Sequence, residues 1–310
     1  MSAELESSRG RSPATHEAAI SATGPSAAGR AQQAAPLHER DANDLPAAGR
    51  GRRRPTQHSA LALSLALLVA LLAAWEAFVR LRGLSPLVLP PPGAVAAKLA
   101  EQLASGALLP HTATTLAEIL LGFALGAALG VGSGALVAHS PLLRRVLTPY
   151  LIASQAMPKL ALAPLFVLWL GYDLTPKVVI TALIAFFPLF ENTVVGLNEV
   201  APEKLELFRM LRASAWQTFV KLRVPSALPY LFAGLRVAMV LSVVGAVVGE
   251  YVGANRGLGA LIIASQGTLD TPLMFAVFVL LTLLGVGLYL LVAAVERLIL
   301  AWRWESGARE

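Results

Sequence analysis

Long apolar runs separated by short polar or basic segments dominate the chain from residue 59 onward. Each of six runs has about the 20 apolar residues that an α-helix needs to cross the hydrocarbon core of a bilayer. None alternates apolar and polar residues as a membrane β-strand does. The pattern predicts an all-α, polytopic membrane protein with six transmembrane helices, over residues 59–79, 112–138, 146–170, 177–197, 230–252 and 273–298.

The composition also favours a membrane protein over a soluble enzyme. Hydrophobic residues make up 56% of the chain and charged residues 14%, whereas roughly 25% of the residues of a soluble domain are charged. The absence of cysteine excludes disulfides, thiolate metal sites and a cysteine nucleophile. The net charge of +6 does not indicate a nucleic-acid partner, because the basic residues gather at the ends of the apolar runs.

The chain divides into a tail and a membrane domain. Residues 1–58 are rich in Ala, Ser, Gly and Pro and show no helical or strand period, so we expect a disordered cytoplasmic tail. A signal peptide is a weaker alternative, since the leader is too long and no clear cleavage site follows. Residues 59–300 are expected to form the transmembrane domain, and 301–310 a cytoplasmic C-terminal tail.

The distribution of Lys and Arg predicts the orientation. If the N-terminus is inside, the inner segments hold most of the basic residues, so both termini are expected to be cytoplasmic. These residues lie in 50–54, at 144–145, in the loop 198–228 and in the C-terminal tail. Two outer segments should carry short helices: an amphipathic one over 94–103, and a re-entrant or interfacial one within 253–272.

Small and polar residues recur inside the spans. Glycines four residues apart in the second span predict close helix packing, and Glu118 on the same stripe should face the protein interior. These glycines are Gly122, Gly126, Gly130 and Gly134. Glu250, which closes the fifth span, is as well explained by a cap or a salt bridge as by contact with a solute.

The third and fourth spans combine prolines with polar groups. Pro158 and Pro164 should kink the third span. Kinked helices with polar groups often line a cavity in transporters, although a structural kink in a packed bundle explains the same residues. The candidate translocation path comprises Met157, Pro158, Trp169, Phe186, Phe187, Glu191 and Asn192.

The loop 198–228 carries eight charges and therefore cannot span the membrane. A first helix should run from 202 to 211 and break at Arg212 and Ala213. Ser214 and Gln217 then fit a capping box that starts a second short helix, ending before Pro225. Several large aromatic side chains are unfavourable in a loop that is fully exposed to water. We therefore expect them to be buried against this protein's own membrane domain or against a partner. They are Phe208, Trp216 and Phe219.

This loop resembles the EAA loop of binding-protein-dependent ABC importer permeases. Glu206 stands at the Glu position, followed by Leu207 and Phe208 at the two Ala positions, and the spacing continues through Leu222 to Pro225. The stretches 213–219, 225–229, 234–236 and 257–259, and 158–171 in the third span, are similar to the branch that serves nitrate, sulfonates, taurine and thiamine-pyrimidine precursors. Arg212 departs from the pattern, which has a Gly there that would permit a positive φ.

The resemblance implies a type I ABC importer permease-like bundle that is not an enzyme. The loop would form the coupling helix that docks on a separate ATPase. The residues implied in this contact are Glu206, Leu207, Phe208, Arg209, Arg212, Ala213, Ser214, Trp216, Gln217, Phe219 and Pro225. The implied partners are two ATPase copies, a second permease copy in a homodimer, a periplasmic or lipid-anchored solute-binding protein and the lipid of a bacterial inner membrane. No cofactor, metal or catalytic residue is expected. The solute would be a sulfonate or taurine, nitrate or a pyrimidine-type compound.

Two other classes of protein fit parts of this pattern less well. An ion-coupled secondary transporter could use Glu118 and Glu191, but no internal repeat is visible. An intramembrane enzyme would need a metal cluster or paired catalytic carboxylates, and the five histidines do not cluster.

Overall fold

The computed structural model describes residues 57–307, and all regular secondary structure in this stretch is helical. This confirms the predicted all-α fold. Within the described residues, six helical segments are long and apolar enough to cross a membrane when a bent pair of helices, α4 to α5, is taken as one span. The other five are the long apolar helices α1 (Gln57–Arg82), α3 (Leu108–His139), α6 (Leu174–Asn198), α9 (Val224–Tyr251) and α11 (Thr271–Gly307).

The predicted tails lie largely outside the described residues. Of the N-terminal segment 1–58, only the last two residues are described, and they begin α1. Of the C-terminal segment 301–310, residues 301–307 continue α11. The predicted disorder of the N-terminal tail therefore stays a prediction.

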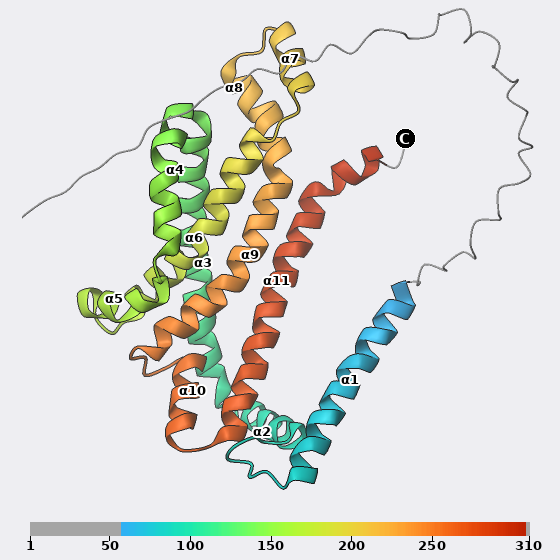
Figure 1. Ribbon diagram of the computed structural model, residues 1–310, viewed down its shortest axis with the longest axis vertical. Coiled ribbons are helices and arrows are strands. Elements are labelled where there is room, and N and C mark those ends of the chain that lie inside the picture. Colours follow the sequence, from blue (N-terminus) through green and yellow to red (C-terminus); the bar gives the residue numbers. More distant parts are fainter. Residues whose placement is uncertain (1–56, 308–310) are drawn as a thin grey trace, which may run out of the picture. The chain divides into compact units, whose positions relative to one another are not determined.

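Helix α6 packs against α3 and against α9 in the two most extensive helix contacts of the described residues, and it lies at the centre of the bundle (Figure 1). The four glycines of α3 face α6 and are buried. A Cβ at Gly126 would lie 2.7 Å from the carbonyl oxygen of Ala182, and one at Gly130 would lie 2.7 Å from that of Phe186. These distances are too short for real contacts, so the glycine stripe is what allows the two backbones to approach, as predicted.

The third span is broken rather than merely kinked. Helix α4 (Pro141–Ala156) ends before Pro158, and the chain continues through the 3-10 turn η2 (Lys159–Leu162) into α5 (Ala163–Leu170) at 77° to α4. Met157 is extended, with φ −70° and ψ 130°, because a following proline disfavours the helical conformation. The kink predicted within 146–170 is thus a full break between two helices, and it lies at Pro158.

The short helices other than α5 lie toward the two ends of the bundle (Figure 1). One end holds α2 (Pro92–Ala104) and α10 (Leu258–Gly267), which fall within the two outer segments predicted to carry short helices. The opposite end holds α7 (Pro202–Met210) and α8 (Ala215–Thr218).

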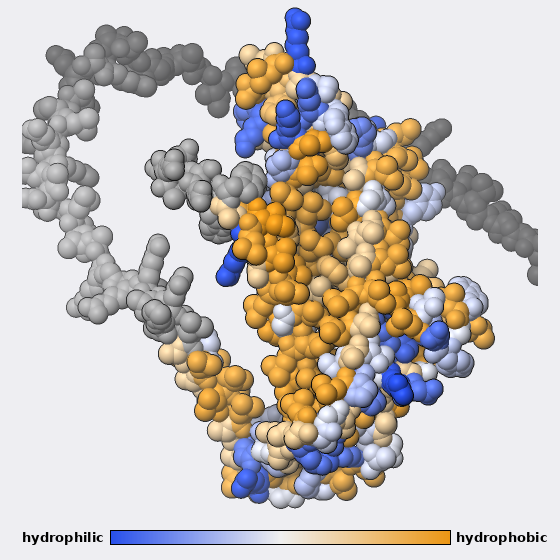
Figure 2. All heavy atoms as spheres, turned by 180° about the vertical axis from the view of Figure 1, so that it is seen from behind, coloured by the Kyte–Doolittle hydropathy of each residue, from blue (hydrophilic) through white to orange (hydrophobic). Residues whose placement is uncertain are grey.

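The surface is apolar over most of the length of the helices. Figure 2 shows this apolar face, with hydrophilic residues mainly toward its ends. Large side chains such as Leu129, Leu168 and Leu290 are exposed on the helices. A folded protein in water rarely exposes an apolar area of this extent, so this surface fits contact with lipid.

Candidate functional site

The charged loop begins with a helix whose ends follow from its sequence. Pro202 occupies the first turn of α7, where its missing N–H group is not needed, and Glu203 lies beside it. Arg209 lies in the last turn. Acid at the start and base at the end both complement the helix dipole. The predicted helix over 202–211 is confirmed to within one residue.

The turn after α7 contains the residue that departs from the EAA pattern. Arg212 adopts a left-handed backbone, with φ 51°, at the position where the family pattern has Gly. The left-handed conformation costs a non-glycine residue roughly 1–2 kcal/mol. The chain therefore keeps the turn that a glycine would make, at a local cost in conformational energy.

The predicted capping box at the start of α8 is present. The Ser214 hydroxyl accepts a hydrogen bond from the backbone N–H of Gln217 at 3.2 Å, and the Gln217 side chain accepts one from the backbone N–H of Ser214 at 2.9 Å. Both bonds satisfy donors that a helix N-terminus otherwise leaves free. They also set the angle at which α8 leaves the turn.

The sequence predicted that the second loop helix ends before Pro225, and this prediction is wrong. It continues through the π-helical turn η3 (Phe219–Arg223) directly into α9, so residues 215–251 form one 37-residue helix. Pro225 lies in the first turn of α9. A proline ring collides with the carbonyl group four residues earlier in a regular α-helix, and the wider π turn relieves this collision.

The loop aromatics divide between the two alternatives left open by the sequence. Phe219 packs against the buried residues Ala138, Leu197 and Ala227 of this protein's own bundle. Trp216 stacks on Phe219, with ring centroids 6.0 Å apart, yet is 72% exposed. Phe208 is half-buried. Three apolar neighbours are also exposed: Leu207, Met210 and Leu211.

Four large apolar residues at the loop end are exposed, and we call them the loop patch: Leu207, Met210, Leu211 and Trp216. The docking residues that the resemblance implied do not include Met210 or Leu211. Their position in a charge-rich segment that cannot enter the membrane is the signal that could have identified them. Large exposed apolar residues on a polar loop indicate a protein contact.

A cavity of about 570 Å³ lies between the broken third span, α6 and α9. Four of the seven predicted path residues line it: Met157, Phe187, Glu191 and Asn192. The other three, Pro158, Trp169 and Phe186, are not among its lining residues. Trp169 lies edge-on to Phe166 and is 65% exposed. Gln155 and Lys159 complete the polar lining, and Val237, Leu241 and Val244 of α9 add to its apolar part.

The cavity combines an aromatic ring with several polar groups. The Lys159 ammonium lies 3.7 Å from the centroid of the Phe187 ring, a cation–π contact. The Gln155 amide donates a 2.5 Å hydrogen bond to the Glu191 carboxylate. The Asn192 amide donates to the Pro188 carbonyl oxygen at 2.8 Å. The lining therefore offers both hydrogen-bond donors and acceptors beside an apolar wall.

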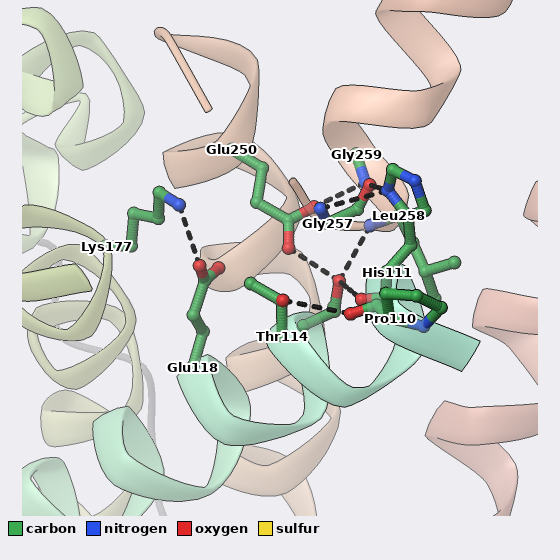
Figure 3. Close-up of polar contacts among 10 residues, drawn as sticks. Pro110, His111, Thr114, Glu118, Lys177, Glu250, Gly257, Leu258 and Gly259 are labelled. Carbon is green, nitrogen blue, oxygen red and sulfur yellow. Dashed lines mark hydrogen bonds and ion pairs between the residues drawn. The ribbon is translucent and has the colours of Figure 1, made fainter. Parts of the chain in front are cut away.

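A buried polar cluster lies near the α10 end of the bundle (Figure 3). Lys177 of α6 donates to Glu118 of α3 at 2.9 Å. The Thr115 hydroxyl donates to Glu250 of α9 at 2.5 Å. Glu118 and Glu250 are 0% and 1% exposed. Glu118 faces the interior, as predicted, and Glu250 is held by internal hydrogen bonds.

The sequence interpretation did not identify Lys177 or His111 as parts of this cluster. Lys177 is the first residue of the predicted span 177–197, and it is buried. His111 Nδ1 lies 2.9 Å from the carbonyl oxygen of Gly257 and 3.2 Å from its amide nitrogen. Depending on its tautomer, the ring donates to the first or accepts from the second. No group of three His, Asp or Glu residues suited to a metal occurs within 57–307.

Known proteins resemble the chain along most of its length. A family model described as binding-protein-dependent transport system inner membrane component matches residues 122–301. The riboflavin transport system permease protein RibX of Chloroflexus aurantiacus is 42% identical over 235 residues, which are 76% of this chain and 88% of the relative. The formylaminopyrimidine transport permease protein ThiX of Halalkalibacterium halodurans is 39% identical, over 75% of this chain and 92% of the relative.

More distant similarities agree with these. The taurine transport system permease protein TauC of Escherichia coli is 29% identical over 78% of this chain and 90% of its own. A chain of the MetNI methionine ABC transporter has the same fold, with a TM-score of 0.55 and 22% identity over 62% of this chain and 95% of that one. The matches do not support the secondary-transporter and enzyme alternatives. The chain belongs to the family of binding-protein-dependent transport system inner membrane components and is a membrane-embedded permease subunit of an ABC importer.

Proposed function

We propose that the cavity between the third span, α6 and α9 is part of the translocation path for a ring-containing organic solute of the pyrimidine or isoalloxazine type. The observation that carries this proposal is the lining, in which the Phe187 ring stands beside two amides, an ammonium and a carboxylate. Aromatic faces stack on planar ligands, while scattered donors and acceptors fix the orientation of a heterocycle.

Charge argues against the other solutes of this branch. Glu191 places a carboxylate in the lining, and this charge opposes a sulfonate or nitrate even though Lys159 lies nearby. The sequence identities of the relatives support the same solute class. The riboflavin and formylaminopyrimidine permeases are 42% and 39% identical to the chain, and the taurine permease is 29% identical.

The loop patch is the proposed docking site for the ATPase. The family implies an ATPase, a solute-binding protein and a dimeric permease. The stoichiometry proposed here is two copies of this chain, two ATPases and one binding protein, in a bacterial inner membrane. Exposure of Leu207, Met210 and Trp216 supports this role, since apolar and aromatic residues anchor interfaces. Arg209 and Arg212 beside them would set orientation through charge.

The loop end is proposed to face the cytoplasm. Arg144 and Arg145 line one small cavity together with Asn198, so these arginines lie at the same end as the basic loop. Because the chain has no cysteine, single cysteines can report its orientation without background. In intact cells, Met210→Cys should resist a membrane-impermeant thiol reagent and Ser105→Cys should react. The reverse pattern would contradict the orientation.

Uptake into proteoliposomes tests the solute class. The permease is reconstituted with its ATPase and binding protein and offered riboflavin, a formylaminopyrimidine, taurine or nitrate. Accumulation of one of the two ring compounds, with no taurine or nitrate uptake, is expected. Phe187→Leu should then slow ring-compound uptake about 3- to 10-fold, the effect of losing an aromatic stack. Phe278→Leu, on the exposed surface of α11 and outside the cavity lining, is the matched control. Uptake of taurine or nitrate instead would refute the assignment.

A further inference from the structure

The buried cluster of Figure 3 has unequal numbers of opposite charges. Glu118 and Glu250 contribute two carboxyl groups and Lys177 one ammonium. Within the described residues, no other charged side chain enters it. His111 is engaged with the backbone of Gly257, and α10 contains no titratable residue. Two ionised carboxylates would leave one uncompensated negative charge in a nearly dry interior, which is costly.

One carboxyl oxygen of this cluster has no partner in the described part of the chain. Glu118 Oε1 accepts from Lys177, but Glu118 Oε2 is fully buried and makes no hydrogen bond. Figure 3 shows the Glu118 carboxyl group between Lys177 on one side and the Glu250 carboxyl group on the other. Ionised carboxylates only accept hydrogen bonds. The two groups can therefore bond to each other only if a proton lies between them.

The other polar contacts leave this position open for a proton. Glu250 Oε1 accepts from the Thr115 hydroxyl, and Glu250 Oε2 accepts from the backbone N–H of Gly259. Each of these bonds uses one lone pair of its oxygen, and a carboxyl oxygen has two. Tyr251, next to Glu250 in α9, is 41% exposed and donates no hydrogen bond to the pair within the described part of the chain.

We propose that Glu118 and Glu250 form a proton-binding site that holds one proton between them, while Lys177 neutralises the remaining charge. Through this site Glu250 acts as a positioning residue for the turn that starts α10. The site is a single unit, in the way that paired carboxylates in other proteins share one proton.

The geometry of the turn shows what the pair positions. The Leu258 N–H donates to the Thr115 hydroxyl at 2.8 Å, and the Gly259 N–H donates to Glu250. Gly257 has φ 128°, and a Cβ there would collide with the Glu250 carboxyl group. The carboxyl pair thus links the start of α10 to both α3 and α9. Removing either hydrogen-bond acceptor would release the turn.

Infrared spectroscopy of the full chain in lipid nanodiscs tests the proton directly. At neutral pH the wild type should show the C=O stretch of a protonated carboxyl group, and Glu118→Gln and Glu250→Gln should each remove it. Glu296→Gln, which removes a carboxylate paired singly with Arg236 at 3.2 Å, is the control and should leave the band unchanged. Absence of the band from the wild type, or its survival in both cluster variants, would overturn the proposal.

A charge-rescue experiment tests the role of Lys177. Lys177→Met leaves a buried charge unpaired and should lower the melting temperature on the order of 10 °C. Adding Glu118→Gln removes that charge, so the double variant should recover most of the loss. The five tryptophans provide the fluorescence signal. A double variant that melts no higher than Lys177→Met alone would show that Lys177 does not act by charge compensation and would overturn that part of the proposal.

Discussion

Truncating Trp216 to alanine should weaken the permease–ATPase complex without disturbing the fold of the permease. A tryptophan offers up to about 250 Å² for burial, so the 72% of Trp216 that is exposed corresponds to about 180 Å². At about 25 cal/mol per Å², full burial of this area on docking would contribute about 4.5 kcal/mol. Measured truncations at interface centres more often cost 2–4 kcal/mol, and this is the expected range, about 30- to 1,000-fold in affinity.

The assay is retention of the ATPase on immobilised permease in detergent, titrated to give an apparent Kd. Trp169→Ala is the matched control, because Trp169 is also an exposed tryptophan, at 65%, but lies in α5. Both variants should melt like the wild type, since neither ring is deeply packed. Equal retention of the ATPase by wild type and Trp216→Ala would refute the docking role of the loop patch.

Three further substitutions test the local physics. Arg212→Gly should remove the cost of the left-handed backbone and raise the melting temperature by about 2–4 °C, a gain of about 1 kcal/mol; no rise would mean that the arginine side chain compensates elsewhere. Ser214→Ala should lose the capping box and cost about 1 kcal/mol, seen as faster amide hydrogen exchange in α8; unchanged exchange would contradict this. Gly130→Ala should lower thermal stability because its Cβ meets the α6 backbone, whereas Gly132→Ala, with open space around it, should not; equal melting of the two would contradict the close-packing role of the stripe.

Features set by neighbouring residues could be predicted from the sequence. The capping box depends on Ser214 and Gln217, three positions apart, and the glycine stripe depends on a four-residue spacing along one helix. The EAA spacing likewise lies within twenty residues. In each case the periodicity of a single helix determines which side chains lie together.

Features that join distant segments could not be predicted. Lys177 meets Glu118 across 59 positions, and His111 meets Gly257 across 146. Such pairs depend on which helices are neighbours and on their rotation, and a lone Lys at the start of an apolar run equally fits a membrane boundary. The continuation of α8 into α9 past Pro225 was missed for a related reason, because a proline signals a break unless a wider turn accommodates it.

The π turn at η3 determines how far Trp216 is rotated about the axis of the long helix relative to the residues of α9. At 3.6 residues per turn, each added or removed residue rotates everything beyond it by about 100°. Deleting Val220 would therefore turn Trp216 to a different azimuth while the face of α9 that packs on α6 stayed in place. The extra residue in this one turn thus fixes the direction in which Trp216 points.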